Sequence, residues 1–170
     1  MIGVGCSDPD EAKLSPFEFR GQRVGMPMDA LEQSLIARDG GGWTACDTLR
    51  NGMRRCSLQT PFVLGEFEAL ADPRGRVVRM RVTITHSPGD MAFDRQLSAM
   101  ENAWFKVKGM RVDTGGVSDA HPVGRVTFAT ARGRWIAVVT FAGAMCWRSS
   151  YPCPDRIELA DARAGVDTIP

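Results

Sequence analysis

The stretch "RVVRMRVTIT", residues 76–85, decides the fold class of this chain. Apolar and polar side chains alternate along it, which is typical of a β-strand with one buried face and one solvent-exposed face. The apolar segment 62–71 precedes it, and the turn between them has Pro73 at its second position and Gly75 at its end. These residues predict an antiparallel hairpin.

Two helices are predicted from apolar residues that repeat with helical spacing. The first follows Pro27 and ends at the glycine run 40–42. The second begins after Asp90, a suitable N-cap, and ends at Gly109. The expected buried faces contain Met28, Leu31, Leu35 and Ile36 in the first helix, and Phe93, Leu97, Met100 and Trp104 in the second.

The remaining apolar segments predict further strands, at 43–49, 53–59, 123–131, 134–146 and 153–159. The order of elements predicts an α+β fold in which two helices pack on a curved antiparallel sheet. The pattern Ala-x-x-Arg-Gly-Arg occurs at 71–76 and again at 129–134. This echo favours an internal duplication of an α-β-β-β-β unit, although the close cysteine pairs of the two halves do not occupy equivalent places.

The chain is expected to form a single domain, because its 170 residues are enough for one compact core. Residues 1–16 are polar and without period, and we expect them to be a flexible tether. Residues 17–159 are expected to be the α+β domain, and residues 160–170 a flexible tail. The net charge of +1 gives no argument for nucleic-acid binding.

Cys46 and Cys56 flank an Asn-Gly turn. A three-residue loop closed by Leu49 and Met53, with Gly52 in the left-handed region, places the two cysteines directly opposite each other. Such partners lie about 4.5–5.5 Å apart at Cα, within disulfide range. A two-residue loop would instead place Cys46 opposite a serine. The first register predicts a hairpin stapled by a disulfide.

Cys146 and Cys153 are expected to form a second bridge, because a four-residue loop at 148–151 places Trp147 opposite Pro152 and the cysteines opposite each other. Zinc binding is a weaker alternative, since the intervals do not match zinc knuckles. A redox Cys-x-x-Cys motif is absent, and unpaired core cysteines are the other alternative. Two structural disulfides predict an oxidising, extracytoplasmic compartment such as the periplasm.

Cys6 is left without a partner and is the candidate for lipidation. A polar segment and then the domain follow it, as in bacterial lipoproteins. The preceding Val4-Gly5 is similar to the end of a lipobox, with Gly3 in place of the usual leucine. A lipidated Cys6 would attach the protein to a membrane surface, and a free thiol is the alternative.

The segment "FRGQRVGMPMDALEQSL", residues 19–35, resembles the opening of small exported bacterial modules of the BamE-like and β-lactamase-inhibitor-like type. The resemblance implies a helix followed by a curved antiparallel sheet, the absence of catalytic residues, and binding through a sheet face or loops. Pro27 departs from it, since these modules usually have Ser or Thr there. The residues that match are Phe19, Gly21, Gly25, Met26 and Leu31.

No catalytic, cofactor or metal site is predicted. The two histidines, His86 and His121, lie next to or near prolines in expected strand-end and loop positions. None of the motifs typical of a serine nucleophile, a phosphate-binding loop, a zinc protease or a dinucleotide-binding domain is present.

Two surfaces are predicted to contact partner proteins. On the hairpin formed by residues 62–71 and 76–85, Glu66 and Glu68 are expected to pair with Arg79 or Arg81. The arginines of this strand are also a candidate basic patch for an acidic partner or acidic lipid head groups. The second surface is the tip of the second stapled hairpin, whose residue types are enriched at binding hot spots. Its residues are Trp147, Arg148 and Tyr151.

These features favour a non-catalytic, extracytoplasmic accessory or scaffold subunit of a membrane-associated complex, for example a respiratory, photosynthetic or envelope-assembly complex. The hypothesis predicts protein partners, no nucleic acid and no cofactor. Two alternatives stay open: a soluble protein inhibitor or ligand-binding module, and an enzyme with an unrecognised site.

Overall fold

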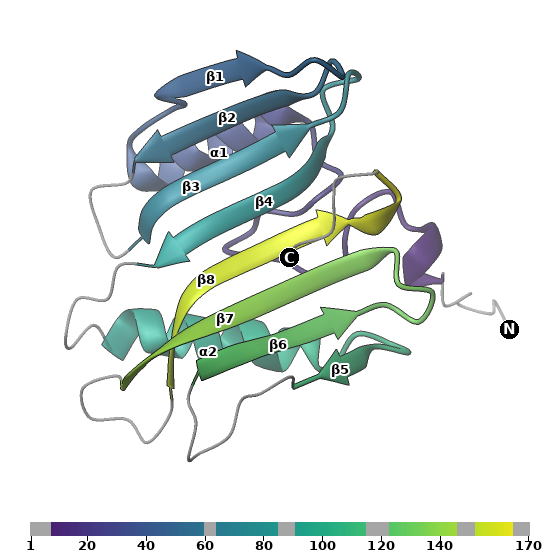
Figure 1. Cartoon of the computed structure of the whole chain (residues 1–170), viewed down its shortest axis with the longest axis vertical. Helices are drawn as coiled ribbons and strands as arrows, with labels where there is room; N and C mark the ends of the chain where they lie inside the picture. The colour runs from purple at the N-terminus through teal and green to yellow at the C-terminus, as the bar shows by residue number, and fades with distance from the viewer. Residues whose placement is uncertain (1–7, 60–63, 85–90, 115–122, 146–151, 165–170) are drawn as a thin grey trace, which may run out of the picture.

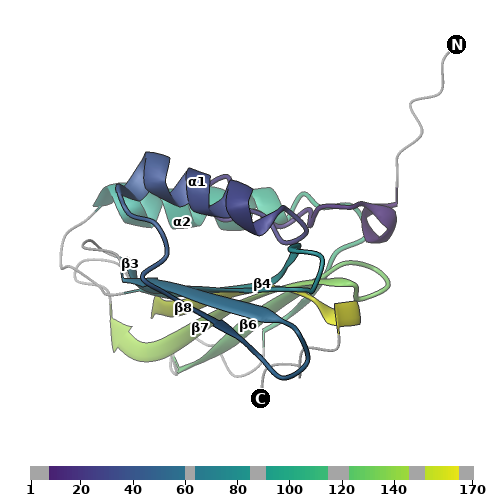
Figure 2. The same cartoon turned by 90° about the horizontal axis from the view of Figure 1, so that it is seen from above.

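A computed structural model describes residues 8–59, 64–84, 91–114, 123–145 and 152–164 of the chain. These residues form an α+β fold with an eight-stranded antiparallel sheet, in the order β1-β2-β3-β4-β8-β7-β6-β5. Both α-helices lie on one face of this sheet, as Figure 2 shows from above. The predicted fold class is therefore confirmed at the level of two helices on an antiparallel sheet.

The helices are α1 (Met28–Asp39) and α2 (Met91–Trp104), with short 3₁₀-helices at Pro9–Glu11 and Ala162–Ala164. The strands of the first half are β1 (Ala45–Thr48), β2 (Arg54–Gln59), β3 (Leu64–Ala71) and β4 (Val77–Ile84). Those of the second half are β5 (Arg111–Asp113), β6 (Val123–Ala129), β7 (Trp135–Met145) and β8 (Pro152–Asp161).

Each half of the chain runs from a helix into four consecutive antiparallel strands (Figure 1). The last strands of the two halves, β4 and β8, then pair with each other at the centre of the sheet. Residues 79–83 of β4 lie opposite residues 156–160 of β8. This single pairing makes one continuous sheet out of two four-stranded meanders.

The main core lies between the helices and the sheet and is rich in aromatic residues. Trp104 of α2 packs edge-to-face on Phe17 and Phe128, with ring centroids 5.8 and 5.2 Å away. All three side chains are almost fully buried. Because each large apolar side chain contributes about 1.5–3 kcal/mol when buried, these contacts hold α2 firmly against the second half of the sheet.

The first helix follows the predicted pattern with one exception. Met28, Leu31 and Leu35 are buried, and Gly40 ends α1 in the left-handed conformation, with its N–H donating to the carbonyl of Ile36. The Ile36 side chain, expected on the buried face, is 49% exposed. It fits the helical period but lies at the margin of the face that the sheet covers.

The N-terminal segment is a correction to the expected tether. Residues 8–16 are part of the folded domain: they contain a 3₁₀-helix, and both Asp10 and Ser15 are buried. At the other end, Ala160 and Asp161 belong to β8, and a 3₁₀-helix follows them, so the expected tail begins too early. Residues 1–7 and 165–170 lie outside the described residues.

Asp10 fastens this segment to the turn between β6 and β7. Its carboxylate accepts hydrogen bonds from Thr130 Oγ1 at 2.5 Å and from the backbone N–H groups of Arg132 and Arg134 at 2.9 and 3.0 Å. Burial disfavours the charged carboxylate, but these hydrogen bonds outweigh it and hold the pKa of Asp10 below its ordinary value. Asp10 can thus be buried, because residues far away in the chain donate hydrogen bonds to its carboxylate.

We predict that Asp10→Asn lowers the free energy of unfolding at pH 7 by about 2 kcal/mol, because an amide cannot accept all three hydrogen bonds. The pKa of folded Asp10 lies below its ordinary value of 3.8. The stabilisation is therefore present above that pH and is lost as the pH falls through the folded pKa. Urea denaturation between about pH 7 and about pH 2 should show a smaller loss of stability in the variant than in the wild type.

Glu11→Gln is the matched control for this experiment. Glu11 lies on the same 3₁₀-helix, but its ion pair with Arg132 is largely exposed, so the substitution should change the free energy of unfolding by less than about 1 kcal/mol. Equal effects of the two substitutions would contradict the role given to Asp10.

Candidate functional site

The face of the sheet opposite the helices has a charged cluster at its centre, formed by β3, β4 and β8. Met80 and Val82 of β4 point into the helix-side core. Because side chains alternate along a strand, Arg79 and Arg81 lie on the opposite face. There they meet glutamates from both neighbouring strands. We call this set the central charged cluster; its members are Glu68, Arg79, Arg81 and Glu158.

Glu158 is the most buried member of the cluster, with its side chain 2% exposed. Its Oε2 lies 3.4 Å from Arg81 Nε, and its Oε1 lies 3.7 Å from Arg79 Nε. Arg79 also reaches Glu68, at 3.6 Å from Nη2 to Oε1. Arg79 Nε and Glu158 Oε1 are buried, and neither has a hydrogen-bond partner among the described residues. The cluster is thus paired in charge but incompletely hydrogen-bonded.

The expected pairing of Glu68 with an arginine across the hairpin is confirmed. Arg79 and Arg81, two residues of the predicted basic patch, are both paired with glutamates. Two arginines and two glutamates balance, so the cluster itself carries no net charge. Its arginines can still present side-chain donors to a partner, since the side chains of Arg79 and Arg81 are 18% and 33% exposed.

The first cysteine pair forms the predicted disulfide, with 4.2 Å between the Cα atoms. Cys46 lies opposite Cys56 in the strand register, and Leu49 N–H donates to Met53 across the loop. Gly52 adopts a φ of 77°. The three-residue loop and the register of this hairpin are therefore confirmed.

Of the second cysteine pair, the structure describes the backbone of Cys153 but not Cys146. Pro152 pairs with Met145, two positions earlier than the expected partner Trp147, after register shifts along β7 and β8. The register proposed for this hairpin is thus wrong at its base. Cys146 lies outside the described residues, so a bridge to Cys153 stays a prediction.

The other predicted positions also fall outside the described residues. They are the lipidation candidate Cys6, the hairpin-tip residues Trp147, Arg148 and Tyr151, and the histidines His86 and His121.

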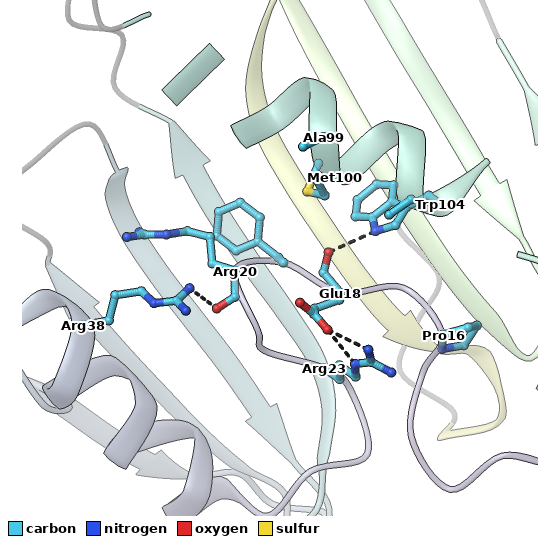
Figure 3. Close-up of a pocket in the computed structure, with 10 residues that line it drawn as sticks. Pro16, Glu18, Arg20, Arg23, Arg38, Ala99, Met100 and Trp104 are labelled. Carbon is cyan, nitrogen blue, oxygen red and sulfur yellow. Dashed lines mark hydrogen bonds and ion pairs between the residues drawn. The ribbon is translucent and has the colours of Figure 1, made fainter. Parts of the chain in front are cut away.

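A pocket of about 690 Å³ opens on the helix side of the molecule, between the N-terminal residues 16–23 and the two α-helices (Figure 3). One wall is apolar and comes mainly from α2. The other wall has three arginines, from residues 16–23 and from α1. The lining residues on α2 are Ala99, Met100, Ala103 and Trp104, and the arginines are Arg20, Arg23 and Arg38.

Hydrogen bonds fix the loop of residues 16–23 that forms one side of this pocket. Phe19 and Gln22 exchange backbone hydrogen bonds of 3.0 and 2.9 Å, which close a two-residue turn at Arg20 and Gly21. Trp104 Nε1 donates to the carbonyl of Glu18 at 2.9 Å and ties this loop to α2. The position of the pocket walls is thus set by backbone contacts as well as by side chains.

The arginines of the pocket differ in their partners. Arg23 donates from Nε and Nη2 to the same oxygen of Glu18, Oε2, at 2.9 and 2.6 Å, and Arg20 pairs with Asp39 at 3.2 Å. Arg38 donates to the backbone carbonyl of Arg20 and has no carboxylate partner among the described residues. These arginines were not predicted from the sequence as a site, because the loop that brings them together has no repeating pattern.

No group of three or more potential metal ligands occurs among the described residues. In the same part of the chain, no helix has the length and apolar composition needed to cross a membrane. Comparison of the chain with protein-family models, curated proteins and solved structures gave no match.

We predict that peptide mapping under non-reducing conditions finds Cys46 linked to Cys56 in the purified protein. Reduction, or the double substitution Cys46→Ser and Cys56→Ser, should lower the free energy of unfolding by about 2–3 kcal/mol, since the bridge closes a loop of about ten residues. The same map tests the second bridge, which would give a peptide with Cys146 linked to Cys153. That bridge would also lower the intact mass of the protein by a further two hydrogens. Free thiols at positions 46 and 56 would contradict the first prediction.

We also predict that Glu158→Ala lowers the free energy of unfolding by about 1–3 kcal/mol, because it leaves Arg79 and Arg81 with too few partners. Chemical denaturation at neutral pH measures this effect. Glu66→Ala is the matched control: Glu66 is exposed on β3, and its removal should change stability by less than about 0.5 kcal/mol. A neutral effect of Glu158→Ala would show that the cluster does not stabilise the sheet.

Proposed function

We propose that the protein is a non-catalytic, extracytoplasmic accessory or scaffold module that binds other proteins in a membrane-associated complex through the open face of its sheet. The observation that carries this proposal is the central charged cluster. It lies on the face opposite both helices, and it includes two partly exposed arginines, one of which, Arg79, has a buried Nε without a hydrogen-bond partner among the described residues.

Such a cluster suits recognition better than it suits stability. A buried ion pair adds little net stability, because its desolvation cost offsets the attraction between the charges, whereas arginine is among the residues that contribute most at protein interfaces. A partner that offers a carbonyl or carboxylate could bind the exposed parts of the Arg79 and Arg81 side chains. The strands beneath are rigid and paired on both sides, so little conformational entropy is lost on binding.

The extracytoplasmic location is supported by the disulfide of β1 and β2. Cys46 lies on the edge strand of the sheet and is exposed, so cytoplasmic reductants would have access to this side of the hairpin. A membrane anchor through Cys6 and the resemblance to BamE-like modules are parts of the same proposal.

An internal duplication of an α-β-β-β-β unit is supported by the order of the elements, since each half has a helix and four strands and the fourth strands meet. The sequence echo does not add to this support. One copy of Ala-x-x-Arg-Gly-Arg lies at the turn between β3 and β4, and the other lies between β6 and β7. In a duplicated unit, the turn between β7 and β8 would be the equivalent of the first.

Site-specific photocrosslinking of the full chain in its native host tests the proposed binding face. A photoreactive residue at Arg156, exposed on β8 beside the cluster, should give discrete protein adducts in the membrane fraction. The same residue at Ala37, exposed on α1, is the control and should give none.

Charge substitutions sharpen the test. Thr83→Glu adds an acidic side chain two residues from Arg81 at an exposed position, and it should reduce the adducts at 156 at least fivefold without affecting folding. Ala37→Glu should leave them unchanged. Recovery of the wild-type protein as a free monomer in the soluble fraction, with no adducts from either position, would refute the proposed function.

A further inference from the structure

We propose that the pocket between residues 16–23, α1 and α2 binds a monocarboxylate with an apolar tail, such as a medium-chain fatty acid. The site lies on the opposite side of the sheet from the proposed protein-binding face. The proposal is therefore independent of the proposed function.

The size and lining of the pocket fit an amphiphile. Its volume of about 690 Å³ lies within the range typical of small-molecule sites. Figure 3 places Met100 and Trp104 on one side and Arg20 and Arg38 on the other, with Glu18 between them and Arg23 paired to Glu18. An apolar tail would lie along α2, where Ala99 and Ala103 leave room beside the larger side chains.

The charges of the pocket indicate an occupant with one negative charge. Glu18 neutralises Arg23, and Asp39 neutralises Arg20, so one of three arginine charges remains. That charge belongs to Arg38, whose guanidinium contacts a backbone carbonyl with one nitrogen. The remaining donors of a guanidinium match a planar carboxylate. A carboxylate bound beside Arg38 and Arg20 would also lie away from the negatively charged Glu18 side chain.

The two-residue turn holds the backbone of Arg20 in an unusual conformation. Its φ of 53° makes it the only residue other than glycine with a positive φ among those that the structure describes. Such a conformation is unfavourable for a residue with a Cβ and persists where the surroundings enforce it. The turn thus places Arg20 in the lining of the pocket, with its guanidinium paired to Asp39.

Titration with sodium octanoate tests the proposal, followed by ¹H–¹⁵N NMR of the tryptophan indole groups. Trp104 lines the pocket, and its indole signal is assigned with Trp104→Phe. Octanoate should shift this signal saturably, with a dissociation constant of about 1 mM. Acetate carries the charge alone and 1-octanol the tail alone, and both should bind at least tenfold more weakly.

Variants separate the charge from the apolar wall. Arg38→Gln should weaken octanoate binding about tenfold, because it removes a charge-assisted contact, and Arg38→Lys should weaken it less. Ala99→Glu, at an exposed position of the apolar wall, should also weaken it. Arg95→Gln is the matched control on α2 outside the lining and should bind as the wild type does. Thermal melting of each variant confirms folding.

Three results would overturn the proposal. The first is the absence of a saturable shift up to about 10 mM octanoate, ten times the expected dissociation constant. The second is acetate binding as tightly as octanoate, which would show a site for small anions only. The third is octanoate binding that Arg38→Gln leaves unchanged in a folded variant.

Discussion

The pairing of β4 with β8 is the constraint on which the rest of the structure depends. Every other strand pair joins neighbours in the chain, whereas this one joins residues 79–83 to residues 156–160. It makes one sheet of two meanders, gives both helices the same face to cover, and brings Glu158 beside Arg79 and Arg81. Because long loops must close before it forms, its free energy has to come from the core that it completes.

The N-terminal segment reinforces this arrangement by contacting both halves. Arg76 donates to the carbonyl of Gly25, and Arg134 donates to the carbonyls of Asp10 and Ala12. Arg76 and Arg134 are the last residues of the two Ala-x-x-Arg-Gly-Arg copies. The repeated pattern therefore reflects one shared task, a tight turn followed by an arginine that binds backbone carbonyls, carried out at two non-equivalent turns of the sheet.

The sequence predicted what local geometry decides. Alternation identified β4, and the turn at Gly52 fixed the register that joins Cys46 to Cys56. Contacts between residues far apart in the chain could not be predicted from the sequence. Asp10 was assigned to a polar tether, because its hydrogen-bond partners lie more than 100 residues away in the chain. Ile36 matched the helical period, but only the sheet decides which part of a helix is covered. The pocket was missed for the same reason, since three separate segments assemble it.

The two faces of the sheet would select the proposed occupants by different physical effects. On the open face, charges are balanced within the central charged cluster, so a partner gains little from net attraction. It must instead match the positions of donors and acceptors, and a poorly matched partner leaves a buried charge without its pair. On the helix side, Arg38 supplies an excess positive charge beside an apolar wall, which attracts any anion with a tail and discriminates weakly among tails. If both proposals hold, the protein-binding face would be highly specific for its partner, whereas the pocket would tolerate different ligands.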